Sequence, residues 1–334
     1  MPQPTNDTAV SRPDLSQLVS EFRETAMTAA IGGRVMPYFP VSEQSAEFPV
    51  IPKEVMLKIP DTRRAMRGGY PSGDWEFEMG FYATKENGWE ERIDERERKL
   101  YARLFDAEAV ATQRAEKIIQ LSKESRVANK IFSASNFTPH AVTNEWDDAD
   151  NATPIEDVKA AKKAVRSACG MLPNTLIISY STFLDLKSCA EIIDRLLYTF
   201  NMIDMENLTS KQLAAIFDVE QVLVGGAVYD NADKGQDSSI ADLWDNEYAM
   251  LTICSQSQDI TDPCIGRTFV WTEESPGSGE PVVESYYETT KRSDVVRVRH
   301  DSDERLIKSY DENGSVKSDI AAAVSYLLSN ITTK

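Results

Sequence analysis

The sequence predicts an α+β fold, and three stretches carry that prediction. Residues 90–132 contain no Gly and no Pro and consist mostly of strong helix formers. Residues 35–89 are interrupted by Pro, which excludes a long helix and a central strand there. Residues 154–258 alternate short apolar runs with amphipathic segments, and longer strands with alternating polarity follow from residue 268.

The first stretch predicts one long helix over residues 94–129, about 50 Å in length at 1.5 Å per residue. Apolar residues return at helical spacing from Leu100 to Ile131, and charged residues cover the rest of the cylinder. The repeat is not a strict heptad and no second long helix follows, which argues against a coiled coil. We expect a structural beam with Ala111 in the middle of its apolar stripe.

The Pro-interrupted stretch predicts a two-stranded ribbon with a basic tip at residues 61–73. The tip combines Gly and Pro with Arg63, Arg64 and Arg67. It binds an anion or a partner, or it is a solvated loop; no GK[ST] sequence and helix follow, so it is not a phosphate loop. The predicted strands are residues 46–51, 55–59 and 74–82. Such a ribbon has few residues for a core of its own and must lie on another surface.

The later part of the chain predicts helices and buried strands in alternation. Thr153 and Glu156 match a capping box that begins a helix ending at Gly170. Two more helices are predicted at residues 183–198 and 210–217. Buried strands are predicted at residues 176–179, 222–224 and 249–254. A last helix is predicted at residues 319–330, and residues 1–13 predict a disordered arm followed by a short helix at residues 15–30.

Composition limits the classes of function. The formal net charge is −18, which argues against tight non-specific binding of nucleic acid, because phosphate binding needs concentrated Lys and Arg. The four Cys residues form no CxxC pair, and His140 and His300 lie far from them in sequence, so no zinc template is present. No GxSxG or HExxH motif is present, and acidic residues are too common for any one pair to be informative. We therefore predict no metal, no cofactor and no enzymatic activity, and no apolar run is long enough to span a membrane.

The order of these parts resembles the major capsid proteins of tailed bacteriophages, which have the Hong Kong 97-type fold. The resemblance covers residues 35–307. It rests on the stretches FDAEAVATQRAEKIIQLSKESRVAN, IEDVKAAKKAVRSACGMLPNTLIIS, LAAIFDVEQVLVGGAVYDN and ESYYETTKRSDVVRVRHDSDERLI. It implies an N-terminal arm (1–34), an extended E-loop (35–89), a P domain with the spine helix (90–153), an A domain (154–260, with its border near 154–170 left open), return strands of the P domain (261–311) and a C-terminal segment (312–334).

The resemblance also implies a structural function. The chain would self-assemble through hexameric and pentameric capsomers into the icosahedral head shell of the phage and enclose double-stranded DNA without reading its sequence. The implied partners are a portal, a separate scaffolding protein and a decoration protein. The scaffolding protein is expected to be a separate chain because only a short arm precedes the E-loop. The implied location is the virion capsid, assembled in the host bacterial cytoplasm. Two alternatives stay open: an encapsulin-like bacterial nanocompartment shell protein, and a soluble carboxylate-dependent α/β enzyme.

The candidate functional residues are contacts between subunits. Arg63, Arg64 and Arg67 crowd the tip, and four acidic residues crowd the expected N-terminus of the long helix, where the helix dipole favours negative charge. These acidic residues are Glu90, Glu91, Asp94 and Glu95. In the resembled fold the E-loop lies across a neighbouring subunit, so we expect the tip of one subunit to pair with these acids on the next.

Overall fold

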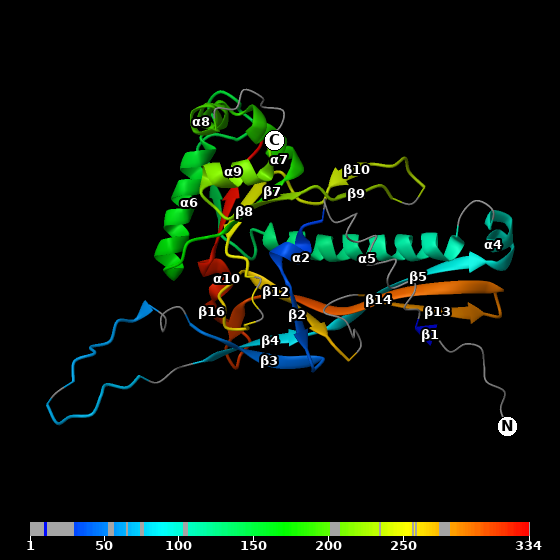
Figure 1. The fold of residues 1–334 in the computed structure, drawn as a ribbon, viewed down its shortest axis with the longest axis horizontal. Coiled ribbons are helices and arrows are strands. Elements are labelled where there is room, and N and C mark those ends of the chain that lie inside the picture. Colours follow the sequence, from blue (N-terminus) through cyan, green and yellow to red (C-terminus); the bar gives the residue numbers. More distant parts are fainter. Residues whose placement is uncertain are drawn as a thin grey trace.

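A computed structural model describes residues 10–11, 30–52, 57–64, 66–73, 77–102, 106–200, 208–233, 235–255, 257, 259–273 and 281–333. Two larger sheets lie at either side of one long helix, and a thin ribbon extends away from them (Figure 1). The mixed architecture confirms the predicted α+β class.

The stretch predicted as one helix forms a strand and two helices. These are β5 (Lys85–Asp94), α4 (Glu95–Tyr101) and α5 (Ala107–Ile131). Each helix begins at an aspartate whose side chain accepts an amide hydrogen bond, from Arg96 to Asp94 over 2.7 Å and from Glu108 to Asp106 over 3.0 Å. Asp is a preferred N-cap residue, so the two aspartates start new helices where residue propensity alone predicts one continuous helix.

A six-stranded sheet lies under the first half of α5. It has the order β1-β13-β14-β12-β2, with β5 paired to β14 along ten residue pairs. Its other strands are β1 (Val10–Ser11), β2 (Tyr38–Val41), β12 (Gly266–Trp271), β13 (Val282–Glu288) and β14 (Ser293–Leu306). Ala111, Ala115 and Ile119 of α5 pack in one buried cluster with Val296 and Val298 of β14. Ala111 therefore lies in a packed interface, as predicted.

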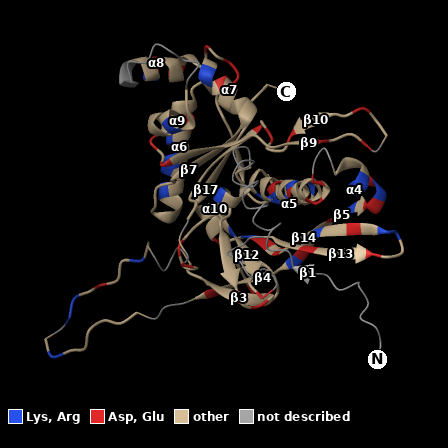
Figure 2. Cartoon of the chain, turned by 45° about the vertical axis from the view of Figure 1, so that its right-hand side comes forward, with Lys and Arg blue, Asp and Glu red and all other residues tan. Residues whose placement is uncertain are grey.

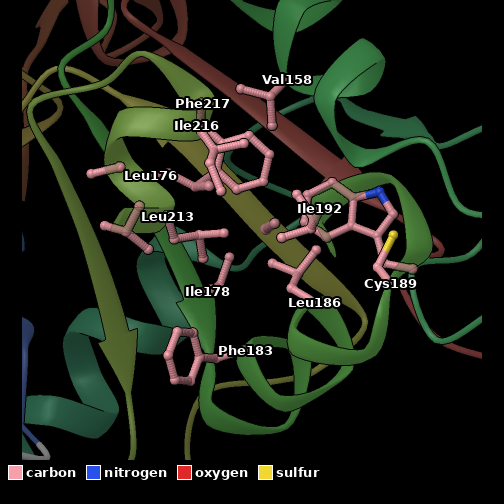
Figure 3. Packing of buried hydrophobic residues seen from close by; sticks show 14 of the residues in the cluster. Val158, Leu176, Ile178, Phe183, Leu186, Cys189, Ile192, Leu213, Ile216 and Phe217 are labelled. Atoms are coloured by element: carbon pink, nitrogen blue, oxygen red, sulfur yellow. The ribbon is translucent and has the colours of Figure 1, made fainter. Parts of the chain in front are cut away.

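A five-stranded sheet forms the second layer, in the order β6-β17-β11-β7-β8. Its strands are β6 (Pro139–Ala141), β7 (Thr175–Ser179), β8 (Gln221–Gly225), β11 (Tyr248–Thr252) and β17 (Ser325–Ser329). Four helices cover one face: α6 (Pro154–Cys169), α7 (Tyr180–Ser188), α8 (Ala190–Phe200) and α9 (Ser210–Phe217). Leu176 and Ile178 of β7 meet Leu186, Ile192 and Leu213 of these helices in the main core (Figure 3).

The second half of α5 packs against the opposite face of the five-stranded sheet. Val127 and Ile131 share a buried cluster with Ile177, Leu223 and Met250. The long helix therefore contributes to the cores of both sheets and is the structural beam that the sequence predicted, although it is shorter.

The ribbon, residues 45–83, leaves this body at the pair β3 (Ser45–Val50) and β4 (Glu78–Ala83). At its base Tyr82 stacks on Phe269 with ring centroids 4.5 Å apart, and Phe48 packs on the same ring at 5.1 Å. Beyond the base, the described residues of the tip are largely exposed and extend away from the body (Figure 1). The prediction of a ribbon with little core of its own is confirmed.

Several smaller predictions are wrong or lie outside the described residues. Helix α6 begins at Pro154 as predicted, but Thr153 makes no side-chain cap; a capping box forms instead between Thr209 and Gln212 at the start of α9. The helix predicted at 183–198 is divided at the buried Cys189. Residues 57–59 form no strand, and Val10 and Ser11, in the arm predicted to be disordered, form β1 on the edge of the six-stranded sheet. Residues 1–9, 12–29, 53–56 and 74–76 are outside the described part.

The predicted C-terminal helix is also wrong. Residues 319–330 form the short helix α10 (Ile320–Ala323) and then β17, which pairs antiparallel with β11. Leu327 and Leu328 point to opposite faces of the sheet and both are buried, because helices pack on each face. The remaining short elements are α2 (Gly32–Val35), β9 (Val228–Asp230), β10 (Ile240–Asp242), β15 (Lys308–Tyr310) and β16 (Val316–Asp319).

Candidate functional site

The three tip arginines lie on the exposed loop of the ribbon. The Nε of Arg64 donates a hydrogen bond to the carbonyl oxygen of Gly68 over 2.7 Å, and its guanidinium lies 4.7 Å from the ring centroid of Tyr70. The amide of Arg63 donates to the Asp61 carboxylate, and Arg67 has a left-handed backbone with φ of 66°. These local contacts shape the tip and leave its charges facing solvent.

The four candidate acids do not share a helix N-terminus, so that part of the prediction is wrong. Glu90 and Glu91 lie on β5, Asp94 is the N-cap of α4, and Glu95 is its first residue. The physical reason is the ten-residue pairing of β5 with β14, which extends the chain up to Asp94. The four residues nevertheless lie within one short segment at the end of the molecule far from the tip (Figure 1).

Each acid already has a partner in its own chain. The Glu90 carboxylate is 2.7 Å from the Arg297 guanidinium, and Glu91 accepts a hydrogen bond from the Trp89 indole over 3.0 Å. The Arg292 guanidinium donates to Glu95 over 2.8 Å, and this hydrogen bond, with the charges of Lys99 and Arg292, lowers the Glu95 pKa. The structure therefore does not bring the tip and the acids together within one chain.

A second set of charges on α5 is buried, which the sequence did not predict. Glu124 accepts hydrogen bonds from the amides of Ile31 and Gly32 over 2.8 and 2.7 Å and from the Trp244 indole over 2.7 Å. These three donors come from the segment before β2 and from the chain after β10. The Glu124 carboxylate therefore supplies the hydrogen-bond acceptor that three buried N–H groups need in place of solvent.

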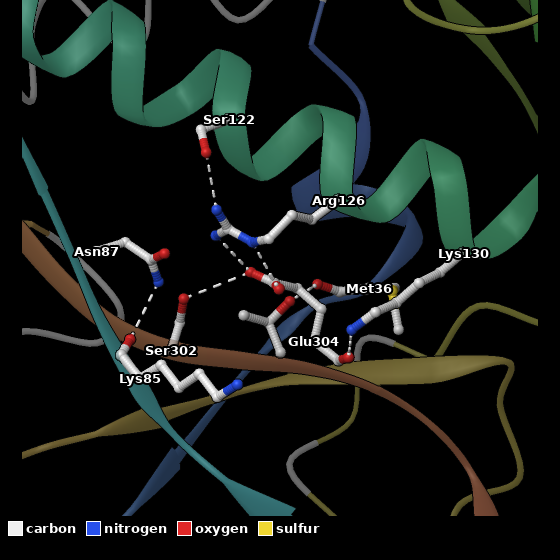
Figure 4. A network of polar contacts seen from close by, with 9 residues as sticks. Met36, Lys85, Asn87, Ser122, Arg126, Lys130, Ser302 and Glu304 are labelled. Carbon is white, nitrogen blue, oxygen red and sulfur yellow. Dashed lines mark hydrogen bonds and ion pairs between the residues drawn. The ribbon is translucent and has the colours of Figure 1, made fainter.

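Two and six residues after Glu124 on α5, Arg126 and Lys130 bind Glu304 of β14 (Figure 4). The Arg126 guanidinium donates to both Glu304 carboxylate oxygens over 3.0 and 2.9 Å, and the Lys130 ammonium donates to the Glu304 carbonyl oxygen. Burial raises the Glu304 pKa, but the hydrogen bond and charge of Arg126, together with Lys130, hold it below its usual value. Burial also lowers the pKa of Lys130.

One sequence pattern does point to buried charge on α5. The apolar stripe of α5 is thin, so charged residues must occupy part of its buried face. Three charged residues of α5 are buried: Glu116, Lys123 and Glu124. The sequence pattern instead predicted that charged residues cover the part of the helix outside the apolar stripe.

The described residues contain no group of His, Cys, Asp and Glu suited to hold a metal ion. His140 stacks on Tyr326 and His300 packs edge-on against Tyr38, so each imidazole lies against a tyrosine ring. All four cysteines are buried and unpaired, and burial raises the pKa of the Cys254 thiol to about 12, which keeps it protonated and unreactive. Among the described helices, none is long and apolar enough to cross a membrane.

Comparison with known proteins links this architecture to capsids. No protein-family model matches the chain. The major capsid protein of Burkholderia phage BcepMu is 28% identical over 273 residues, which cover 78% of this chain and 82% of that protein.

Two solved structures share the fold. A phage-related protein from Bordetella bronchiseptica RB50 superposes with a TM-score of 0.68 at 22% identity, over 97% of this chain and 98% of that one. The mature capsid of bacteriophage PhiM1 gives a TM-score of 0.52 at 9% identity, over 90% and 86%. The chain therefore has the Hong Kong 97-type fold of phage capsid proteins, and most of its sequence is similar to one phage major capsid protein.

Proposed function

We propose that this chain is a major capsid protein whose copies self-assemble into the icosahedral head shell of a tailed bacteriophage around double-stranded DNA. The observation that carries the proposal is the sequence match to the BcepMu capsid protein over 78% of the chain, joined to a capsid fold over nearly all of it. The net charge of −18 suits a wall to which DNA should not adhere. The role is structural, and the fold is consistent with a protein that performs no catalysis.

The ribbon fits a tiling function. Ile59 and Met66 are each 96% exposed, although both are large apolar side chains. Interfaces are enriched in Met, aromatic residues and Arg, and the tip carries all three. A ribbon of this composition needs a surface, and a second copy of the chain supplies one when subunits overlap in a shell.

We propose the division of the chain that the resemblance implies. The E-loop would be residues 35–89, and the ribbon within it rejoins the six-stranded sheet at β5. The P domain, residues 90–153 and 261–311, would supply β12, β13 and β14 of that sheet together with α4 and α5. The A domain, residues 154–260, would supply β7, β8 and β11 of the five-stranded sheet and the helices that cover it, to which residues 90–153 add β6 and the C-terminal segment adds β17.

We also propose that the tip arginines of one subunit pair with the acidic segment of the next. Within one chain the tip and this segment lie at opposite ends of the molecule (Figure 1), so a contact between them joins two copies. Exposed pairs contribute little, and three arginines would give about 1–3 kcal/mol per contact. The contribution becomes large only because it recurs at every contact of a closed shell.

Further partners and the site of assembly belong to the same proposal. We expect a portal, a separate scaffolding protein and a decoration protein, with hexamers and pentamers as intermediates and assembly in the host cytoplasm. Co-expression with candidate scaffolding proteins tests this, because a required scaffold raises the yield of closed, uniform shells.

The contents of purified particles distinguish the alternatives. DNA inside the particles, after nuclease has removed external nucleic acid, supports the phage capsid. An enzyme cargo without DNA supports the encapsulin-like shell instead. A stable monomer whose turnover is abolished by one carboxylate substitution supports the soluble enzyme.

A further inference from the structure

The described residues of the β9–β10 hairpin (228–233 and 235–242) are exposed or half-buried. Neither strand contains a buried residue, although Val228, Tyr229 and Ile240 are apolar and Ile240 is 72% exposed. A two-stranded hairpin is marginally stable alone in water and is stabilised when it packs on another surface. Its own chain does not provide that surface among the described residues.

The end of the hairpin is acidic and well formed. The Asp230 carboxylate accepts hydrogen bonds from the amides of Ala232 and Ser239, which fix the loop and lower the Asp230 pKa. Asp233 and Asp237 follow on the same loop and are exposed. The loop therefore presents the exposed carboxylates of Asp233 and Asp237 beside the apolar side chains of the hairpin.

Helix α6 carries the complementary charge. Lys159, Lys163 and Arg166 are exposed at positions i, i+4 and i+7, which places them in one row on the helix surface. Lys162 lies outside this row, with its ammonium 2.6 Å from the Asp218 carboxylate. Just beyond the helix, the apolar Leu172 is also exposed. Each surface thus combines apolar side chains with an excess of one charge: the α6 row is basic although it also holds the exposed Glu156, and the hairpin loop is acidic although its sequence also contains Lys234.

The two surfaces lie on opposite sides of the five-stranded sheet. Figures 1 and 2 place α6 at one side of the molecule and the β9–β10 hairpin at the other, in two orientations. They cannot meet within one chain.

We propose that the β9–β10 hairpin of one subunit docks on the outer face of α6 in a second copy of this chain. The contact is head to tail, so repeating it closes a ring when the rotation between subunits allows. Opposite charges fix the register of the contact, and apolar side chains of the hairpin gain a surface. The inference rests on the proposed self-assembly and specifies which faces meet around the ring.

Charge reversal tests the contact. One variant reverses the charges on α6: Lys159→Glu, Lys163→Glu and Arg166→Glu, which places acidic residues opposite the acidic hairpin. A second variant reverses the hairpin: Asp233→Lys and Asp237→Lys, which places basic residues opposite the basic row of α6. We expect each variant to reduce the yield of sedimenting particles at low salt by about tenfold or more, because facing like charges strongly disfavour an interface. The two sets combined in one chain restore the yield. Lys117→Glu, an exposed reversal on α5, is the matched control and leaves the yield unchanged.

A crosslink gives a second measurement. Lys163→Cys and Asp237→Cys in one chain place thiols on both surfaces, whereas the four native cysteines are buried. Mild oxidation of assembled particles is expected to give a ladder of disulfide-linked oligomers on a non-reducing gel, and the same treatment of dilute subunits is expected to give monomers.

The outcomes separate this inference from the proposed function. Normal particles from both reversal variants, with no crosslinked ladder, overturn the contact and leave the capsid function intact. Failure of the wild-type chain to form particles under any assembly condition overturns both. Circular dichroism of the variant subunits, matching the wild type, shows that a lost yield reflects assembly rather than folding.

Discussion

The indole N–H of Trp244 donates a hydrogen bond to the Glu124 carboxylate over 2.7 Å, and both side chains are buried. Trp244 also packs directly on Gly225 at the end of β8, where a Cβ would come within 2.3 Å of the indole ring. One hydrogen bond thus joins the long helix to the five-stranded sheet. The amides of Ile31 and Gly32 bind the same carboxylate, so Glu124 connects three parts of the chain.

Glu124→Ala is expected to destabilise the subunit by about 3 kcal/mol or more, since it leaves three buried N–H groups without an acceptor. Glu124→Gln retains one oxygen acceptor and is expected to cost less. The free energy of unfolding in urea measures both, with Lys117→Ala on the exposed side of α5 as the control. A Glu124→Ala subunit as stable as the control would show that water reaches these donors.

Ala111→Asp is expected to destabilise the subunit by about 3 kcal/mol, because Ala111 is 7% exposed and its new carboxylate would be buried without a partner. Val110→Asp is the matched control, since the adjacent Val110 is 39% exposed. The measurement is the yield of soluble subunit and of particles. Soluble subunits that assemble normally from Ala111→Asp would contradict the account of α5 as a packed beam.

Glu304 is expected to make the stability of the subunit depend on acid pH. The pKa of Glu304 in the folded chain lies below the usual pKa of a glutamate, so the ionised form stabilises the fold at any pH above that usual value. This contribution is lost as the pH falls through the folded-state pKa. Glu304→Gln is expected to lower the free energy of unfolding by about 3 kcal/mol at neutral pH, because the partly buried Arg126 loses its counter-charge.

The test compares unfolding of the wild type and Glu304→Gln from about neutral pH to about pH 3. The difference between them is expected to shrink on acidification, whereas Glu312→Gln, in an exposed turn, should follow the wild type throughout. A constant difference across this range would rule out the ionised Glu304 as its source.

Arg63→Glu with Arg64→Glu is expected to weaken assembly at low salt if the tip pairs with a neighbour's acids. The wild type itself should assemble less well at high salt, because the screening length falls from about 10 Å at 0.1 M to 3 Å at 1 M. Sedimentation of particles measures both effects, with Lys58→Glu on the same ribbon as the control. Adding Glu91→Lys and Glu95→Lys should restore assembly, and unchanged assembly of the double arginine variant at both salts would exclude the pairing.

Local sequence signals predicted the parts of the fold where neighbours in sequence decide the structure. Helix α9 matches its predicted range, and β7 and β8 match theirs within one residue at each end, because apolar runs and flanking turns define them. The sequence also contains a signal for the division of the long helix. Asp94 and Asp106 are both N-cap residues, and each is followed by an acidic residue in the first turn of its helix.

Other features depend on contacts between distant residues. The extended form of β5 comes from pairing with β14, about two hundred positions later, and overrides the helix propensity of its Glu and Arg residues. Strand β17 is buried on both faces, so its apolar residues show no strand alternation. The Glu124 and Glu304 networks join residues 90 or more positions apart, and no spacing within α5 identifies their partners.

Electron microscopy of the purified chain under assembly conditions tests the central claim most directly. The account predicts closed icosahedral shells, in whose reconstructed density each subunit shows α5 packed between the two sheets and the ribbon lying on a neighbouring copy. A chain that remains monomeric under all conditions, with or without a scaffolding partner, would contradict it.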